Sequence, residues 1–218
     1  MSQTWRRLTF LHWPYEPALV QRLLPPGLVL DTFDGAAWIG LVPFKIHNLR
    51  GIPYFPETNV RTYVIGPDGS RAVWFFSLDA ARLTAVLGAR AVYHLPYFWA
   101  KMRVKSEDGT IHYRSRRKRP HSASVFSEIV VKPGDRFAAE EIGDRDHFLT
   151  ARYRLYTLMR GRLGSAQIEH EPWPLAHAAL VALNQNLIDA AGLPAPVGPP
   201  LVHYAAEIDV KIGCAGIA

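Results

Sequence analysis

The sequence predicts an α+β fold, in which a mostly antiparallel, barrel-like sheet carries about three peripheral helices. Short strand-like runs separated by turn signals fill most of the chain, as where Glu107-Asp108-Gly109 divides two alternating segments. A few stretches break this pattern with the periodicity of helices. The chain has 218 residues, 49% of them hydrophobic, which suits a single domain over residues 1–218 with a large core.

Turn signals divide the predicted strands. Asp34-Gly35 is typical of a two-residue hairpin turn, so strands are expected on both sides of Phe33 to Gly35. The segment around Glu107-Asp108-Gly109 predicts a second hairpin. The expected strands cover residues 5–13, 58–65, 72–78, 101–105, 110–114, 122–131, 164–170 and 201–212.

Helices are expected where the hydrophobic period changes. Residues 17–24 predict a short helix with Pro17 in its first turn, and Asp79 is a candidate cap for a helix over residues 80–93. Two further helices are predicted over residues 144–159 and 175–191, the second ended by Gly192.

Composition excludes several classes of protein. The only cysteine, Cys214, cannot form an internal disulfide, and the apolar stretch near the N-terminus is interrupted by His12 and Pro14. No run approaches the ~20 apolar residues of a membrane span, so we expect a cytoplasmic protein without membrane contact. The net charge is +6, and much of the excess lies in the run Arg114–Arg119, which we interpret as a solvated loop rather than a nucleic-acid site.

Motifs for metals and common cofactors are missing from the sequence. The nine histidines show no ligand spacing, since His170 and His177, for example, lie seven residues apart. There is no P-loop, no GxSxG elbow and no GxGxxG after a strand. We therefore expect neither a metal nor a cofactor.

The segment PETNVRTYV, residues 56–64, carries the candidate chemistry. Strand alternation places Glu57, Asn59 and Arg61 on one face, together with Tyr63. One interpretation is an ordinary solvent face opposite a core face. The other is that the polar face lines a cavity, where a carboxylate, an amide and a guanidinium would hold a ligand bearing a carboxylate or carbonyl group.

Several motifs resemble the uncharacterised YqjF-like family, which is grouped with acetoacetate decarboxylase. They are PETNVRTYV, VWFFSLDA, GARAVYHLPY, FLHWP, LLPPGL, FLTARYRLYT and PPLVHY, and they run over most of the chain. The resemblance implies a cone-shaped, largely antiparallel β-barrel with peripheral helices. It also implies a homo-oligomer and a small-molecule ligand.

The similarity to the decarboxylase itself concentrates in the middle third and fails at the catalytic lysines. The family's glutamate falls on Glu57, its Leu-Asp pair on residues 78–79 and its arginine on Arg90. The proline falls on Pro96, so the two lysines would stand at Tyr97 and Phe98, which cannot form an imine. Lys101 would lie on the same face of the strand as Tyr97. Its alternation with Arg103 and Lys105, however, favours the solvent-exposed face of a hairpin.

We therefore expect a pocket for a small oxo-acid or carbonyl compound, with lyase-like activity as one possibility and no Schiff-base lysine. Glu57 and Tyr97 are the candidate catalytic residues, acting as base and acid. The candidate ligand-binding residues are Asn59, Arg61, Arg90 and His12. The alternatives are a non-catalytic binding protein on the same fold and, last, a binder of nucleic acid or another acidic partner through Arg114–Arg119.

Overall fold

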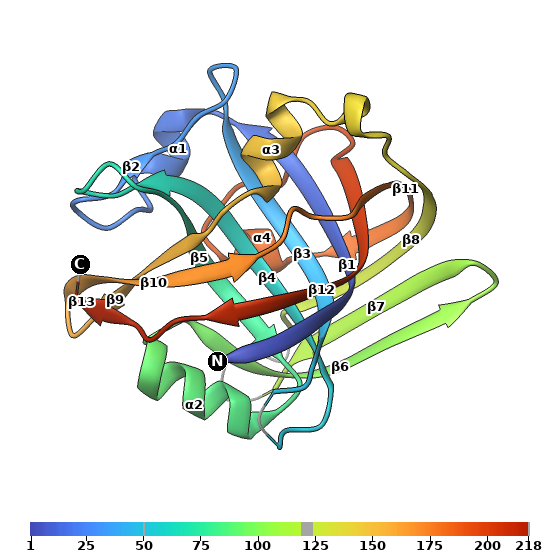
Figure 1. Ribbon diagram of the computed structural model, residues 1–218, viewed down its shortest axis with the longest axis horizontal. Helices are drawn as coiled ribbons and strands as arrows, with labels where there is room; N and C mark the ends of the chain where they lie inside the picture. The colour runs from blue at the N-terminus through green and yellow to red at the C-terminus, as the bar shows by residue number, and fades with distance from the viewer. Residues whose placement is uncertain (50, 119–123, 218) are drawn as a thin grey trace.

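Strands dominate the computed structural model, which describes residues 1–49, 51–118 and 124–217 and joins 13 strands in one sheet (Figure 1). The strands are β1 (Ser2–Tyr15), β2 (Val29–Leu30), β3 (Ala37–His47), β4 (Phe55–Ile65), β5 (Arg71–Ala80), β6 (Tyr97–Glu107), β7 (Thr110–Arg117), β8 (Phe126–Arg136), β9 (Arg154–Met159), β10 (Arg162–His170), β11 (Leu175–Gln185), β12 (Leu201–Ile212) and β13 (Gly216–Ile217). The helices are α1 (Pro17–Gln21), α2 (Leu83–Tyr93), α3 (Asp144–Thr150) and α4 (Leu187–Ala190), with a 3₁₀ turn at Ala139–Glu141. No helix among the described residues is long and apolar enough to cross a membrane.

Strand β5 closes the sheet on itself. One edge of β5 pairs with β4, while the other edge pairs in parallel with β9 at its start and with β6 at its end. Strand β12 is shared in the same way, because β1 lies on one side of it and both β10 and β11 lie on the other. The pairings therefore run through β1, β3, β4 and β5 and return to β12 by two routes, one through β9 and β10 and one through β6, β7, β8 and β11.

Each route encloses its own hydrophobic cluster. Phe10, Phe44 and Leu155 belong to the cluster beside β9 and β10, while Leu11 and Ile129 belong to the cluster beside β7 and β8. Because neighbouring residues of β1 point to opposite faces, the shared strands contribute to both clusters. These strands are consequently buried on both sides.

Most of the predicted strands are confirmed, and the hairpin around Glu107-Asp108-Gly109 joins β6 to β7 as expected. The turn at Asp34-Gly35 also forms, since both residues have positive φ and Phe33 bridges Ala36. The predicted hairpin across it is wrong, because β2 pairs with β4 instead of β3. The chain enters the turn after Asp31, whose buried carboxylate pairs with Arg152 and Arg71.

Two predicted helices are largely wrong. Residues 144–159 form a helix only as far as Thr150, and the remainder continues into β9, which pairs with both β5 and β10. Residues 175–191 form β11, followed by the short α4. In both segments the strand partners decide the conformation, because pairing and burial outweigh a weak intrinsic preference for helix.

The predicted role of Asp79 as a helix cap is also wrong. Asp79 ends β5 and is fully buried, and its carboxylate lies 2.8 Å from Nε of Arg117. The basic run is correspondingly not a loop, because β7 continues through Arg117; Arg119 lies outside the described residues. Helix α2 begins at Leu83, and no side chain caps its first turn.

Removing Arg117 should test how strongly this buried ion pair holds the fold. The substitution Arg117→Met would leave the buried Asp79 carboxylate without its guanidinium, which typically costs about 3–5 kcal/mol of unfolding free energy. Arg114→Met, at an exposed position of the same strand, should change stability by less than about 0.5 kcal/mol. Urea unfolding measures both, and equal small losses would show that the pair contributes little.

Candidate functional site

A small cavity of about 50 Å³ lies inside the ring formed with β9 and β10. Polar side chains from β4, β6 and the segment after α3 meet apolar ones from β5, β9 and β12 around it. Its lining consists of Gln3, Trp5, Ile46, Glu57, Asn59, Arg61, Val73, Phe75, Leu78, Leu95, Tyr97, Thr150, Arg152, Leu155, Ile168, His170, Trp173 and Ile212.

Strand β4 brings Glu57, Asn59 and Arg61 to the cavity by simple alternation. The register shift between β4 and β5 falls between Val60 and Arg61, with the extra residue on β5, so the alternation along β4 is unbroken. Tyr97, the first residue of β6, reaches the same cavity from the neighbouring side of β5. Four of the six predicted site residues therefore share one small space.

Glu57 and Tyr97 form a hydrogen-bonded pair in this space. The Tyr97 hydroxyl donates to Oε2 of Glu57 over 2.8 Å, and Glu57 is only 3% exposed. Burial raises the pKa of Glu57 to about 8, against a smaller opposing effect of the Tyr97 hydrogen bond. Burial, and then the neighbouring Glu57, raise the pKa of Tyr97 well above its ordinary value. At neutral pH both groups are therefore proton donors.

Arg61 is a buried cation without a carboxylate partner. It is 7% exposed, and it takes part in none of the ion pairs of the described residues. Its Nη2 donates over 3.3 Å to the Leu149 carbonyl and to the Tyr63 hydroxyl, while its Nε has no partner in the described chain. A guanidinium in this state favours an anion beside it.

His12 does not line the inner cavity, but it contacts the same Tyr63 hydroxyl as Arg61. Its Nε2 lies 2.6 Å from the Tyr63 hydroxyl, and that hydroxyl donates to the carbonyl of Leu149. This arrangement assigns the proton to Nε2, so His12 donates to Tyr63. Burial lowers the pKa of His12 well below its usual range, with a smaller contribution from Arg61. Gly40 makes room for the ring, because a Cβ there would lie 3.0 Å from Nε2.

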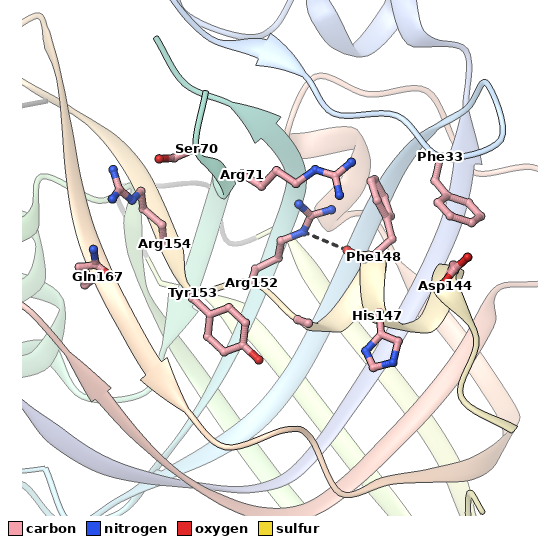
Figure 2. Close-up of a pocket in the computed structure, with 11 residues that line it drawn as sticks. Phe33, Ser70, Arg71, Asp144, His147, Phe148, Arg152, Tyr153, Arg154 and Gln167 are labelled. Atoms are coloured by element: carbon pink, nitrogen blue, oxygen red, sulfur yellow. Dashed lines mark hydrogen bonds between the residues drawn. The ribbon is translucent and has the colours of Figure 1, made fainter. Parts of the chain in front are cut away.

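Arg152 lines the inner cavity and also a second, open pocket of about 660 Å³ near α3. Figure 2 shows its guanidinium beside that of Arg71, with a hydrogen bond to the backbone of Phe148. Both guanidiniums bind Asp31, and the nearby Arg154 binds Asp68, so carboxylates offset much of the positive charge of the open pocket.

Among the unpaired buried side-chain atoms around the inner cavity, donors outnumber acceptors within the described residues. Trp5 Nε1, Arg61 Nε and Arg152 Nη2 are buried donors without partners among the described residues, and all three side chains line the cavity. Asn59 Oδ1 is the one buried side-chain acceptor of the lining that has no hydrogen-bond partner among the described residues. Since buried polar groups are normally satisfied, this excess of donors suits a ligand rich in acceptor oxygens.

The remaining sequence candidates lie outside the cavity. Arg90 donates from Nε to the backbone carbonyl of Tyr97 over 2.7 Å, so it positions that residue without lining the site. Phe98 points to the other side of its strand, where the Arg117 guanidinium lies 3.8 Å from its ring centroid. Lys101 is exposed and lines a surface pocket between β6 and β7.

Sequence reasoning missed Arg152, Trp5 and Trp173 as lining residues. Arg152 lies within the predicted helix over residues 144–159, and the pairing of its guanidinium with Asp31 crosses 121 residues, which no local pattern reveals. The described residues contain no group of three or more histidine, cysteine or acidic side chains that could hold a metal ion.

The fold defined by this sheet is that of the acetoacetate decarboxylase-like proteins. The chain superimposes on acetoacetate decarboxylase of Legionella pneumophila with a TM-score of 0.70 at 14% identity, covering 99% of this chain and 86% of that one. The enduracididine biosynthesis enzyme MppR complexed with pyruvate gives 0.69 at 13% identity, covering 99% and 89%. An acetoacetate decarboxylase-like enzyme of Sphingomonas wittichii RW1 gives 0.64 at 10% identity, covering 100% and 92%.

The chain belongs to the DUF2071 family, described as an uncharacterized conserved protein, whose model matches residues 2–209. It is also 40% identical to the uncharacterized protein YqjF of Bacillus subtilis (strain 168), over 96% of this chain and 89% of YqjF. The resemblance found in the sequence motifs is thereby confirmed.

The raised pKa of Glu57 predicts a pH dependence of stability. Its folded pKa of about 8 exceeds the ordinary value of 4.5, so the folded state holds an extra proton between these values and loses stability as the pH rises through them. Glu57→Gln removes this contribution. Between pH ~5 and ~8 the unfolding free energy of the wild type should fall by about 1 kcal/mol per pH unit relative to the variant. Parallel profiles would show that Glu57 ionises normally.

Proposed function

We propose that this protein binds a small oxo-acid, or a related compound with a carboxylate and a carbonyl group, in the cavity between Glu57 and Arg61. The observation that carries the proposal is the buried Arg61 guanidinium, which has no carboxylate within ion-pair distance among the described residues, in a lining with further unpaired donors. A ligand carboxylate would supply the missing charge and accept from these donors.

The part of the cavity lined by Glu57 suits the ligand's carbonyl oxygen. Glu57 is protonated at neutral pH and accepts from Tyr97 at Oε2, which leaves its own proton for a second acceptor. A neutral carboxylic acid held in an apolar site can donate to a carbonyl or to the enolate formed from it. Glu57 thus acts as a proton donor, whereas the sequence suggested a base, and Tyr97 supports it.

The proposed chemistry does not use a Schiff-base lysine. Among the described residues, no lysine lines the inner cavity. Burial and the nearby Arg7 and Arg6 lower the pKa of Lys45, but its amine lies outside this lining, 4.3 Å from the ring centroid of Tyr54. The structure of the enduracididine biosynthesis enzyme MppR complexed with pyruvate, a neighbour in fold, supports the ligand class.

An enzyme and a binding protein on this fold differ in one measurable respect. If Glu57 donates to the carbonyl oxygen while solvent water takes a proton from the methyl carbon, the enol formed will return to the ketone by taking up deuterium in heavy water, and proton NMR will record the loss of the methyl signal of pyruvate. Binding without exchange identifies a non-catalytic binding protein. The nucleic-acid alternative is weakened by the burial of Arg117 against Asp79 and by the position of Lys118 over the ring of Trp99.

Arg61→Met should separate binding from stability. Losing the guanidinium should weaken pyruvate binding by about tenfold to a hundredfold, the usual range for hydrogen bonds to a charged group. The melting temperature should stay the same or rise, because the substitution removes a buried charge that has no counter-ion. Isothermal titration and thermal unfolding measure the two effects. Arg114→Met is the matched control, and unchanged pyruvate affinity in Arg61→Met would contradict the proposal.

Borohydride reduction should leave the protein unmodified in the presence of pyruvate. An imine between a lysine and the keto group would be reduced to a stable secondary amine and would add the ligand's mass. Intact-mass spectrometry should therefore show no adduct. An adduct on Lys45 or Lys101 would overturn the proposal that the chemistry proceeds without a lysine.

A further inference from the structure

A second, larger space adjoins the inner cavity on the side of α2. It has a volume of about 380 Å³, and much of its lining is aliphatic, including Leu49, Ile52 and Ala89. The two spaces share the lining residues Gln3, Ile46, Leu95, Tyr97, Leu155 and Ile212. The groove along α2 is therefore adjacent to the polar cavity, and Tyr97 lines both.

The sizes of the two spaces indicate which part of a ligand each could hold. A single water needs about 10–15 Å³ on this scale, so the inner cavity of about 50 Å³ has room for only a few non-hydrogen atoms. A carboxylate and a ketone fill such a space. Any further part of the ligand would extend past Tyr97 toward the adjacent groove, where the aliphatic side chains favour hydrocarbon.

Gly88 keeps the groove open. It lies in the interior of α2, where glycine costs about 1 kcal/mol relative to alanine, so its presence there is not explained by the helix. It lines the groove, and a Cβ built on it meets no atom within 4 Å. A larger side chain at this position would fill the groove without a clash inside the fold.

We propose that the natural ligand is an oxo-acid with an aliphatic chain, whose head group occupies the inner cavity and whose chain lies in the groove along α2. This inference rests on the proposed function and adds the class of substrate to it. The six lining residues that the groove shares with the polar cavity favour a chain of the same ligand as the occupant, rather than a second copy of the protein docking through α2.

Chain length provides the test. Isothermal titration with pyruvate, α-ketobutyrate, α-ketohexanoate and α-ketooctanoate should show affinity rising with each added methylene, up to about fourfold per methylene for full burial. Gly88→Trp should abolish this gain and leave pyruvate binding unchanged. Leu87→Trp is the matched control, because Leu87 is exposed on the same helix and lines neither space.

Cys214 offers an independent readout. It is the only cysteine of the chain, it is exposed, and it lines the groove. α-Ketooctanoate should slow its alkylation by iodoacetamide severalfold, while pyruvate should leave the rate unchanged. The same protection in Gly88→Trp would contradict the placement of the chain.

The outcomes separate this inference from the proposed function. If pyruvate binds and longer acids bind no better, the chain-binding groove is wrong and the head-group site stands. If no oxo-acid binds, the proposed function fails. If light scattering shows a wild-type dimer that Gly88→Trp converts to a monomer, without any dependence of affinity on chain length, the groove is an interface between copies and the inference is overturned.

Discussion

The enclosure of β4 on both faces is the constraint on which the site depends. Strand β5 pairs with β4 on one edge and divides its other edge between β9 and β6, so the sheet closes along two routes that both include β4. On an open sheet, an ordinary solvent-exposed face would be formed by Glu57, Asn59 and Arg61. Inside the ring they lose water, and that loss keeps Glu57 protonated and leaves Arg61 without a counter-ion.

Tyr97 gives the cavity a chemistry different from that of an imine-forming enzyme. The hydroxyl of Tyr97 holds Glu57 by a hydrogen bond, and Arg90 holds the Tyr97 backbone from outside. The result is a neutral acid and a buried cation on the same face of β4, which under the proposed function bind and polarise an oxo-acid without a covalent bond. The shared fold places polar groups around one cavity, while the residues at these positions decide which reaction is open to it.

Local patterns in the sequence predicted the elements that local forces determine. The alternation along residues 57–61 and the hairpin at Glu107-Asp108-Gly109 depend on neighbours in the chain, and the sequence motifs identified the fold family. The failures concern long-range partners. The local pattern of residues 175–191 predicts a helix, but pairing with β8 and β12 makes most of them a strand. The local pattern also predicts that Asp79 caps a helix, but its carboxylate pairs with Arg117. Arg152 was missed for the same reason, because its partner Asp31 is distant in sequence.

A crystal structure of the protein with α-ketohexanoate tests the central claim most directly. We predict the carboxylate within hydrogen-bond distance of Arg61, the keto oxygen near Glu57 and Tyr97, and the chain leading out along α2, with no covalent bond to any lysine. A ligand bound in the open pocket near α3, or joined to a lysine, would contradict it.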